Sequence, residues 1–264
     1  MKIEGASILL TGASGGLGQA IARALSDRGG RLILTGRRLD ALQALARQLA
    51  GARAVQADLS EPQQLDELLG QAGEVDILIA NAALPASGLL ESFSVEQIDR
   101  ALEVNLRAPV VLAHALLPQM RANGHGHIVL ISSLAGKAAT AGSSLYNATK
   151  FGLRGFGIAL RSELHGSGVG VSTIMPGFIR EAGMFAESGA KLPPGVGTKA
   201  PEDVAKAVVD AIERNRGEVD VAPLPLRLGS AFAGLAPGIS STITRIAGGD
   251  HVATAMAAGQ AAKR

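Results

Sequence analysis

The chain has no cysteine and no tryptophan, and only one tyrosine among its 264 residues. Without cysteine it can form no disulfide, no thiolate nucleophile and no cysteine-based metal site. Its five histidines are scattered along the sequence, which argues against a zinc site, so we expect no metal. Aromatic residues make up only 3% of the chain. The core must therefore be built from alanine, valine, leucine and isoleucine.

An excess of one charge is also missing, because 25 lysines and arginines nearly balance 23 aspartates and glutamates. A net charge of +2 indicates neither a nucleic-acid partner nor an anionic membrane surface. The segment Met1 to Ser7 does not resemble a secretory signal, and no apolar run is long enough for a transmembrane span. We expect a cytoplasmic protein without an integral membrane segment.

Short apolar runs alternate with helical patterns along the first 222 residues. The predicted strands cover residues 6–10, 31–35, 52–57, 75–80, 127–132, 170–175 and 218–222. Such alternation predicts parallel strands joined by right-handed crossovers. We predict one α/β domain over residues 1–222, with about seven parallel strands and helices on both faces. Residues 223–264 should form a helical C-terminal extension of the same domain.

The intervening segments show helical spacing of apolar residues. The predicted helices cover residues 39–50, 62–70, 94–117, 146–165 and 202–215, besides one after the first strand. Asn105 interrupts an apolar run, so it marks either a purposeful helix distortion or a surface residue. Glycine and proline are dense from Gly177 to Pro201, which predicts a mobile loop.

A glycine-rich turn connects the first strand to the first helix, with four glycines in the seven positions from 12 to 18. Glycine lets the backbone approach a ligand, and a helix N-terminus attracts phosphate. An ordinary strand-to-helix turn would need fewer glycines. The predicted phosphate-binding residues are Gly12, Ser14, Gly15, Gly16, Leu17 and Gly18.

Two arginines, Arg37 and Arg38, follow the second strand, where a dinucleotide fold meets the adenosine ribose. An acidic residue there would bind the 2′-hydroxyl of NAD, whereas guanidinium suits the 2′-phosphate of NADP. Ser14 could add a hydroxyl donor. We therefore favour NADP over NAD, although two solvated surface arginines would have the same sequence.

Tyr146, the only tyrosine, and Lys150 lie four residues apart. On a helix this spacing places both on one face. A lysine cation favours the phenolate, so we expect it to lower the tyrosine pKa from its usual value of roughly 10. Such a phenol could exchange a proton with a carbonyl or alcohol oxygen. The alternative is a helix start with a half-buried tyrosine and a solvated lysine.

Taken together, these motifs resemble the short-chain dehydrogenase/reductase family, in its roughly 250-residue branch. The resemblance rests on motifs in the family's order over most of residues 6–180: Thr11-Gly12-x-x-x-Gly16-x-Gly18, Asp58, Asn81-Ala-Ala, Asn105, Ser133, Tyr146-x-x-x-Lys150 and Pro176-Gly177. It implies a single Rossmann-type doubly wound domain. It also implies NADP(H), or less readily NAD, as the cofactor.

The resemblance implies a role for each matched residue. Tyr146 would exchange the proton, and Lys150 would lower its pKa and hold the nicotinamide ribose. Ser133 would stabilise the reacting oxygen, and Asn105 would hold a water that connects Lys150 to solvent. The remaining residues implied to contact the cofactor are Asp58, Leu59, Asn81, Ala82, Pro176, Gly177 and Ile179.

Two features depart from the family pattern. The family usually has a threonine shortly after Pro-Gly, whereas Arg180 and Glu181 stand near that place. The carboxamide contact is then missing or is made by backbone. The uncharged stretch from Leu228 to Thr244 should form amphipathic helices that cover the pocket or a dimer interface. Peripheral membrane contact and a helical tail without a role are the alternatives.

The segment after the sixth strand contains Phe178, Ile179, Met184 and Phe185. They indicate either an apolar lid or apolar side chains that only anchor the loop. We expect an NADP(H)-dependent oxidoreductase that transfers a hydride between the nicotinamide and an apolar ketone, aldehyde or secondary alcohol, with a lipid- or steroid-like substrate. The alternatives are a 3-oxoacyl-thioester reductase and, in another class, a dinucleotide-binding sensor without catalysis. Family habit implies a homodimer or homotetramer through the helices at 102–117 and 146–165.

Overall fold

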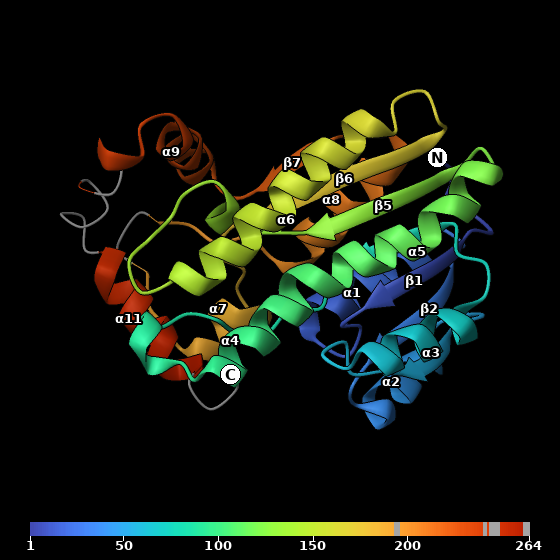
Figure 1. Ribbon diagram of the computed structural model, residues 1–264, viewed down its shortest axis with the longest axis horizontal. Coiled ribbons are helices and arrows are strands. Elements are labelled where there is room, and N and C mark those ends of the chain that lie inside the picture. Colours follow the sequence, from blue (N-terminus) through green and yellow to red (C-terminus); the bar gives the residue numbers. More distant parts are fainter. Residues whose placement is uncertain (193–195, 240–241, 243–248, 261–264) are drawn as a thin grey trace.

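A computed structural model describes residues 1–192, 196–239, 242 and 249–260 of the chain. Parts of the predicted C-terminal helical pattern, at residues 240–241, 243–248 and 261–264, lie outside the described residues. The described part contains one seven-stranded sheet with helices packed around it (Figure 1). None of the helices in these ranges is both long and apolar enough to cross a bilayer.

All pairings in the sheet are parallel, in the order β3-β2-β1-β4-β5-β6-β7. The strands are β1 (Ser7–Thr11), β2 (Arg31–Gly36), β3 (Arg53–Gln56), β4 (Ile77–Ala80), β5 (Gly126–Ile131), β6 (Val169–Pro176) and β7 (Glu218–Val221). The order reverses between β1 and β4, and in open parallel sheets ligands bind at such a switch point, beyond the carboxyl ends of the strands. The predicted doubly wound fold is confirmed.

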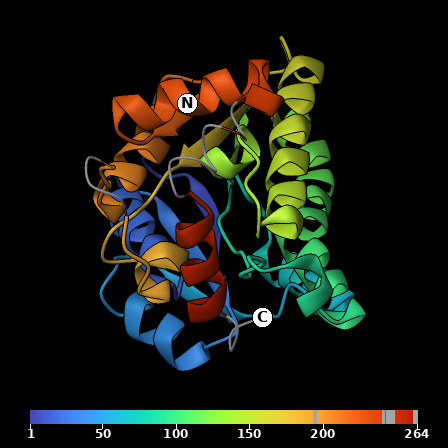
Figure 2. The same cartoon turned by 90° about the vertical axis from the view of Figure 1, so that its left-hand side faces the viewer.

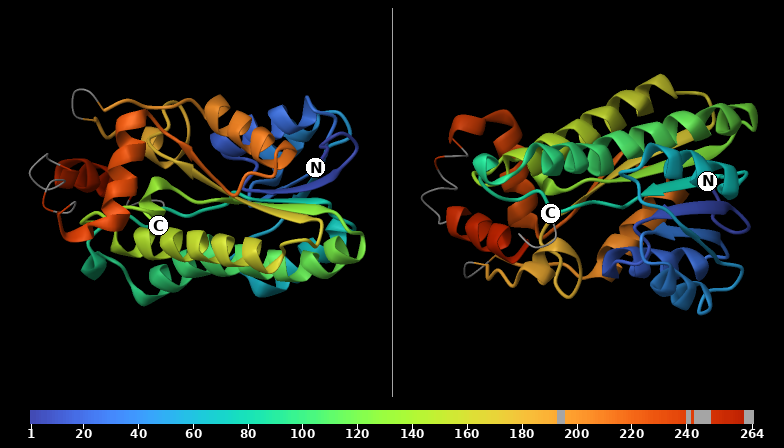
Figure 3. Two further views of the ribbon diagram at one scale, coloured as in Figure 1. Left: turned by 90° about the horizontal axis from the view of Figure 1, so that it is seen from above. Right: turned by 60° about the horizontal axis from the view of Figure 1, so that its bottom comes forward.

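Two layers of helices cover the sheet, one on each face (Figure 3). The layer with α1 (Gly16–Ser26), α2 (Leu39–Ala46) and α8 (Pro201–Glu213) shares one apolar core with the strands. The layer with α3 (Pro62–Ala72), α5 (Ala108–Ala122) and α6 (Ser144–Glu163) shares the other. Since both faces are buried, the central strands are apolar throughout rather than alternating.

The segment predicted as one or two helices at 94–117 is interrupted by a π-helical turn, Glu103–Arg107. It joins α4 (Val95–Leu102) to α5. Ser94 begins α4 with a capping box, because its hydroxyl accepts from the Gln97 amide and the Gln97 side chain accepts from the Ser94 amide. Such π turns occur frequently at functional sites.

Two predicted boundaries were wrong. Helix α2 ends at Ala46 rather than at residue 50, because its last amides bond back three residues instead of four, which tightens and closes the helix. The segment predicted as a mobile loop after β6 contains helix α7 (Gly183–Ser188). There Phe178 and Phe185 pack with ring centres 5.0 Å apart, and this aromatic contact anchors the segment.

The C-terminal extension is helical, as predicted, with α9 (Leu224–Leu235) and α11 (Gly249–Gln260). Both helices lie at the end of the molecule to which the strands point, and α11 lies beside α7 (Figure 2). The extension therefore adds walls at the carboxyl edge of the sheet instead of trailing away from it.

Candidate active site

A cavity of about 1350 Å³ opens at the carboxyl edge of the sheet. Every residue predicted for the cofactor or for catalysis lines it, with the exception of Asn105. One half of the cavity carries the glycine-rich turn and the arginines. The other half carries mainly apolar residues, and Ser133 and Tyr146 lie where the two halves join. The structure thus brings together residues that are spread over most of the sequence.

The glycine-rich turn is packed too tightly for other residues. A Cβ atom on Gly18 would lie 2.3 Å from the Gly12 carbonyl oxygen, and Gly12 has a φ of +65°. Asn81 holds the turn, since its Nδ2 donates to the carbonyl oxygens of Thr11 (2.9 Å) and Gly12 (3.2 Å). The turn at the start of α1 is therefore preorganised for a phosphate group.

Thr11 is a positioning residue that the sequence reasoning quoted but assigned no role. Its hydroxyl accepts the backbone amides of Asn81 and Ala82, both at 3.0 Å. It thereby ties the end of β1 to the end of β4 across the switch point. A threonine that directly precedes a glycine-rich turn was the available signal.

Arg37, Arg38 and Asp58 surround the far end of this half of the cavity. The Arg38 guanidinium donates to the Ser14 carbonyl at 2.8 Å, which braces the glycine-rich turn. The Asp58 carboxylate accepts from the Ser60 amide and hydroxyl and pairs with Arg100 at 3.2 Å. Burial alone would raise the pKa of Asp58, but these hydrogen bonds and the charges of Arg100 and Arg37 lower it overall.

Asn105 lies behind the cavity wall, in the π-helical turn, with only 1% of its surface exposed. Its side chain bonds Leu84 twice: Oδ1 accepts from the Leu84 amide at 2.6 Å, and Nδ2 donates to the Leu84 carbonyl at 3.0 Å. The surface-residue alternative is wrong. Each end of the amide makes one bond to the loop after β4, so the side chain fixes this loop. One N–H and one oxygen lone pair are left, and the water that connects Lys150 to solvent stays a prediction.

Ser133, Tyr146 and Lys150 meet where the two halves of the cavity join. Lys150 is 2% exposed, and its Nζ donates to the Ile131 carbonyl at 3.1 Å. The Ser132 hydroxyl donates to the Lys150 carbonyl at 3.0 Å, which fixes α6 against the end of β5. Ser133 lies two residues after the end of β5, and its hydroxyl donates to the Pro176 carbonyl at 3.3 Å. Its interaction with the Tyr146 phenol lowers the pKa of that phenol.

We predicted that Lys150 would lower the pKa of Tyr146, but in the structure the pKa of Tyr146 is raised. Burial raises the pKa of Tyr146 to about 12, and the Ser133 hydrogen bond offsets only part of that rise. Burial also lowers the pKa of Lys150 to about 8. Spacing on a helix could indicate the proximity of the two groups, but the cost of burying each charge depends on the packed surroundings.

The other half of the cavity is apolar. Its walls come from the loops after β4 and β5, from the segment after β6 and from both C-terminal helices. The apolar side chains there are Leu84, Leu134, Phe178, Met184, Phe185, Leu192, Leu226, Phe232 and Met256. No predicted site residue came from α9 or α11, because apolar helical spacing does not say which cavity a helix lines.

Arg180 and Glu181, the residues that depart from the family pattern, do not line the cavity. They pair with each other at 2.9 Å, and the Glu181 side chain is 68% exposed. Glu181 has a φ of +69°, an uncommon conformation for a residue other than glycine. A carboxamide contact from this segment would therefore have to come from its backbone.

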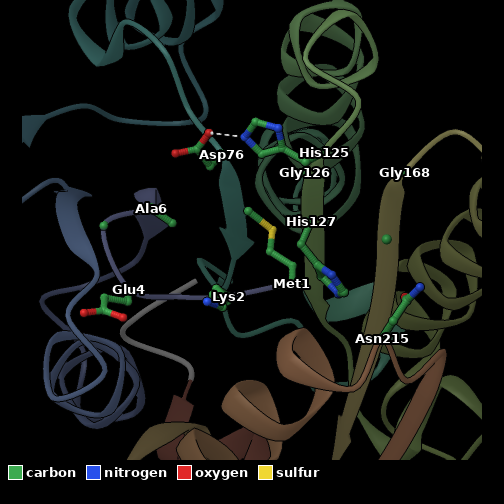
Figure 4. A pocket seen from close by; sticks show the side chains of 12 residues that line it. Met1, Lys2, Glu4, Ala6, Asp76, His125, Gly126, His127, Gly168 and Asn215 are labelled. Carbon is green, nitrogen blue, oxygen red and sulfur yellow. Dashed lines mark hydrogen bonds and ion pairs between the residues drawn. The ribbon is translucent and has the colours of Figure 1, made fainter.

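A second depression lies at the opposite, amino-terminal edge of the strands, around Met1, Asp76, His125 and His127 (Figure 4). The His125 ring pairs with Asp76 at 3.2 Å. His127 is bonded to the Ser172 hydroxyl at 2.8 Å, and burial, followed by nearby positive charges, lowers its pKa to about 3. A neutral, bonded histidine of this kind is structural, so His127 supplies no acid or base to this depression.

Comparison with known proteins agrees with this site. The family model described as short chain dehydrogenase matches residues 6–193. Ketoacyl reductase HetN from Nostoc sp. is 38% identical over 232 residues, which are 85% of this chain and 81% of that protein.

Solved structures match as well. A short-chain dehydrogenase from Sphingobium yanoikuyae in complex with NADPH has a TM-score of 0.77 at 30% identity, covering 89% of this chain and 94% of that one. A bulky-bulky ketone specific alcohol dehydrogenase from Comamonas testosteroni has a TM-score of 0.74 at 28% identity, covering 88% and 94%. The chain belongs to the short-chain dehydrogenase/reductase family and is an oxidoreductase acting on CH–OH and C=O groups.

Proposed function

We propose that the protein is an NADP(H)-dependent reductase of apolar ketones or aldehydes, which in the reverse direction oxidises secondary alcohols. The observation that carries this proposal is the position of Ser133, Tyr146 and Lys150 between two chemically different halves of one cavity. One half has the glycine turn and two arginines, and the other is apolar.

The first half fits a phosphorylated dinucleotide. Gly12, Gly16 and Gly18 leave room for backbone approach to a pyrophosphate at the start of α1. Arg37 and Arg38 would hold a 2′-phosphate, and Lys150 would hold the nicotinamide ribose. When bound, the nicotinamide supplies or accepts a hydride. The relative from Sphingobium yanoikuyae was solved with NADPH, which supports the choice of NADP.

The chain's own residues would handle the proton and the developing charge. With its pKa raised to about 12, Tyr146 is protonated at neutral pH and can donate to a carbonyl oxygen. The Ser133 hydroxyl would donate a hydrogen bond to the same oxygen as negative charge builds on it. The buried Lys150 cation would stabilise the phenolate that remains.

The apolar half favours a neutral substrate. Of the described residues, none of the nearby cations Arg180, Lys191, Lys199 and Arg227 lines the cavity, so a substrate phosphate or carboxylate would find no partner on this wall. A 3-oxoacyl-thioester reductase is the second candidate, and the name of the Nostoc relative supports it. A non-catalytic sensor is the third, and the complete Ser133–Tyr146–Lys150 set argues against it.

We also propose a homo-oligomer that associates through α5 and α6. On α6, Phe151 and Ile158 are 41% and 49% exposed, which is unusual for large apolar residues on a helix that otherwise packs on the sheet. Another apolar stripe on α9, with Leu224, Leu228 and Leu235, is the candidate for peripheral membrane contact. The cytoplasmic location stays a prediction from the sequence.

The test follows consumption of NADPH and of NADH with matched substrates: free apolar ketones and aldehydes, and the same acyl chains as 3-oxoacyl thioesters. We expect turnover with NADPH on the free ketones, and a loss of about 10²- to 10⁴-fold in Tyr146→Phe. Faster turnover of the thioesters would favour the second candidate. Tight NADPH binding without turnover on any substrate would favour a sensor.

A further inference from the structure

An ion cluster with the buried Lys137 at its centre joins three elements that flank the candidate active site. The Nζ atom of Lys137, a residue only 9% exposed, lies 2.6 Å from Asp220 Oδ1 and 2.7 Å from Glu218 Oε1. Glu218 Oε2 in turn lies 2.6 Å from Arg154 Nε. Two cations and two carboxylates, from the loop after β5, from β7 and from α6, therefore balance one another.

Each member of the cluster is close in the chain to a residue of the site. Lys137 ends the short 3₁₀ turn Leu134–Gly136, which begins directly after Ser133. Arg154 follows Lys150 by four residues and Tyr146 by eight, so all three lie on one face of α6. Val221, next to Asp220, accepts a hydrogen bond from the Gly177 amide at 3.0 Å.

None of the four charged side chains lines the cavity, so they cannot touch substrate or cofactor. The other cation near β7, Arg161 on α6, is bonded to Asn215 and to the Val171 carbonyl instead. Burial alone would raise the pKa of Glu218, but the bonds and charges of Arg154 and Lys137 lower it overall. The ion pairs thus favour the charged form of Glu218 and tether β7 to the loop after β5 and to α6.

We propose that Lys137 is a positioning residue for Ser133. Its bonds to β7 fix the loop that carries Ser133 relative to the helix that carries Tyr146 and Lys150. They thereby set the distance over which the Ser133 hydroxyl reaches the Tyr146 phenol. This inference rests on the proposed reductase function, in which Ser133 and Tyr146 act on the same oxygen.

The decisive variant is Lys137→Met/Asp220→Asn, which removes the tether and keeps the charges balanced, because Glu218 stays paired with Arg154. We expect it to fold with nearly wild-type thermal stability. Its kcat should fall about ten- to a hundredfold through misplacement of Ser133, while the KM for NADPH stays unchanged. The matched control, Arg28→Met/Glu213→Gln, removes an exposed ion pair between the turn after α1 and the end of α8, and should keep the wild-type kcat.

The single variant Lys137→Met adds a readout that depends on pH. It leaves the partly buried Asp220 without its cation, so the carboxyl group should bind a proton more readily. Its kcat should therefore recover in part as the pH falls, and this recovery should be absent from the double variant. If the double variant does not fold, Arg154→Met, at a half-buried position, replaces it and should show a smaller fall in kcat.

A measurement without turnover separates this inference from the proposed function. The chain has one tyrosine, so ¹³Cζ-labelled tyrosine gives a single resonance that reports the surroundings of the phenol, including the Ser133 hydroxyl. In Lys137→Met/Asp220→Asn this resonance should shift in the same direction as in Ser133→Ala. Two results would overturn the positioning role. One is a folded double variant whose tyrosine resonance is the same as in the wild type. The other is a double variant with the same kcat as an active wild type.

Discussion

The Nζ atom of Lys150 lies 5.6 Å from the centre of the Tyr146 ring. It donates its hydrogen bond to the Ile131 carbonyl at 3.1 Å. At this distance the cation faces the ring, but burial disfavours charge on both groups. Burial raises the pKa of Tyr146 to about 12 and lowers the pKa of Lys150 to about 8. The pair is therefore set up to hold a proton on the phenol, which suits the donation of that proton during carbonyl reduction.

The first prediction concerns the ionisation of Tyr146. With one tyrosine and no tryptophan, ultraviolet absorbance reports this phenol alone. At about pH 10, an ordinary tyrosine is half ionised, but the folded protein should show almost no tyrosinate. Circular dichroism on the same sample checks the fold. Half ionisation at that pH in the folded state would contradict the raised pKa.

The same pKa determines how stability depends on alkaline pH. The folded-state pKa of Tyr146, about 12, lies above the unfolded value of about 10. Its contribution to stability is therefore full below pH 10 and is lost as the pH rises toward 12. Tyr146→Phe should lose less stability over this range than the wild type. Urea unfolding at both ends of the range measures the difference.

Lys150→Met should separate stability from activity. The folded-state pKa of Lys150, about 8, lies below its unfolded value of about 10.4. The cost of burying this cation is then full below pH 8 and disappears as the pH rises toward 10.4. At pH 7 the variant should unfold at a temperature no lower than the wild type, with kcat reduced at least a hundredfold. A large drop in melting temperature would show that the Ile131 hydrogen bond outweighs the burial cost.

The two arginines should differ in their effect on cofactor choice. Arg37→Ala should raise the Kd for NADPH about tenfold, the loss expected for one charge-assisted contact, and leave NADH unchanged. Arg38→Ala should weaken both cofactors, because Arg38 also braces the glycine-rich turn through the Ser14 carbonyl. Fluorescence titration with each cofactor distinguishes them. An equal loss of affinity for NADPH and NADH in Arg37→Ala would mean that Arg37 does not bind the 2′-phosphate.

Gly259 should matter for the substrate and not for the cofactor. A Cβ atom there would lie 2.1 Å from the Ser188 carbonyl oxygen at the end of α7. The next residue is Gln260, and its Nε2 donates to the Met184 carbonyl at 3.0 Å. Gly259→Ala should push α11 away from α7 and raise the KM for long apolar substrates several-fold, with the NADPH KM unchanged. Gly70→Ala, where a Cβ meets nothing within 4 Å, is the control.

Much of the fold was predictable because its signals are local. Each apolar run that ends at a glycine, an asparagine or a serine became a buried parallel strand, and Pro62 and Pro201 stand at the first turns of α3 and α8. The glycine turn and the Tyr146–Lys150 spacing identified the cavity. In these cases the sequence spacing alone determines which residues share a turn or a helix face.

Other features depend on contacts between distant segments. Nothing around Lys137 in the sequence indicates that it meets Glu218 and Asp220, more than 80 residues away. The π turn at Asn105 follows from its two bonds to Leu84. The pKa of Tyr146 follows from its burial and from Ser133, which lies 13 residues earlier in the sequence. Such properties require the packed structure.

The strand order has a consequence for synthesis on the ribosome. The glycine turn, Arg37, Arg38, Asp58 and Asn81 all leave the ribosome within the first third of the chain. The apolar side of α1, at Ile21 and Leu25, packs against Val204, Val208 and Ile212 of α8, which are made much later. Until α8 is made, the apolar face of α1 is uncovered and the neighbouring sheet lacks its later strands. We therefore expect chaperones to bind the nascent chain at this N-terminal third.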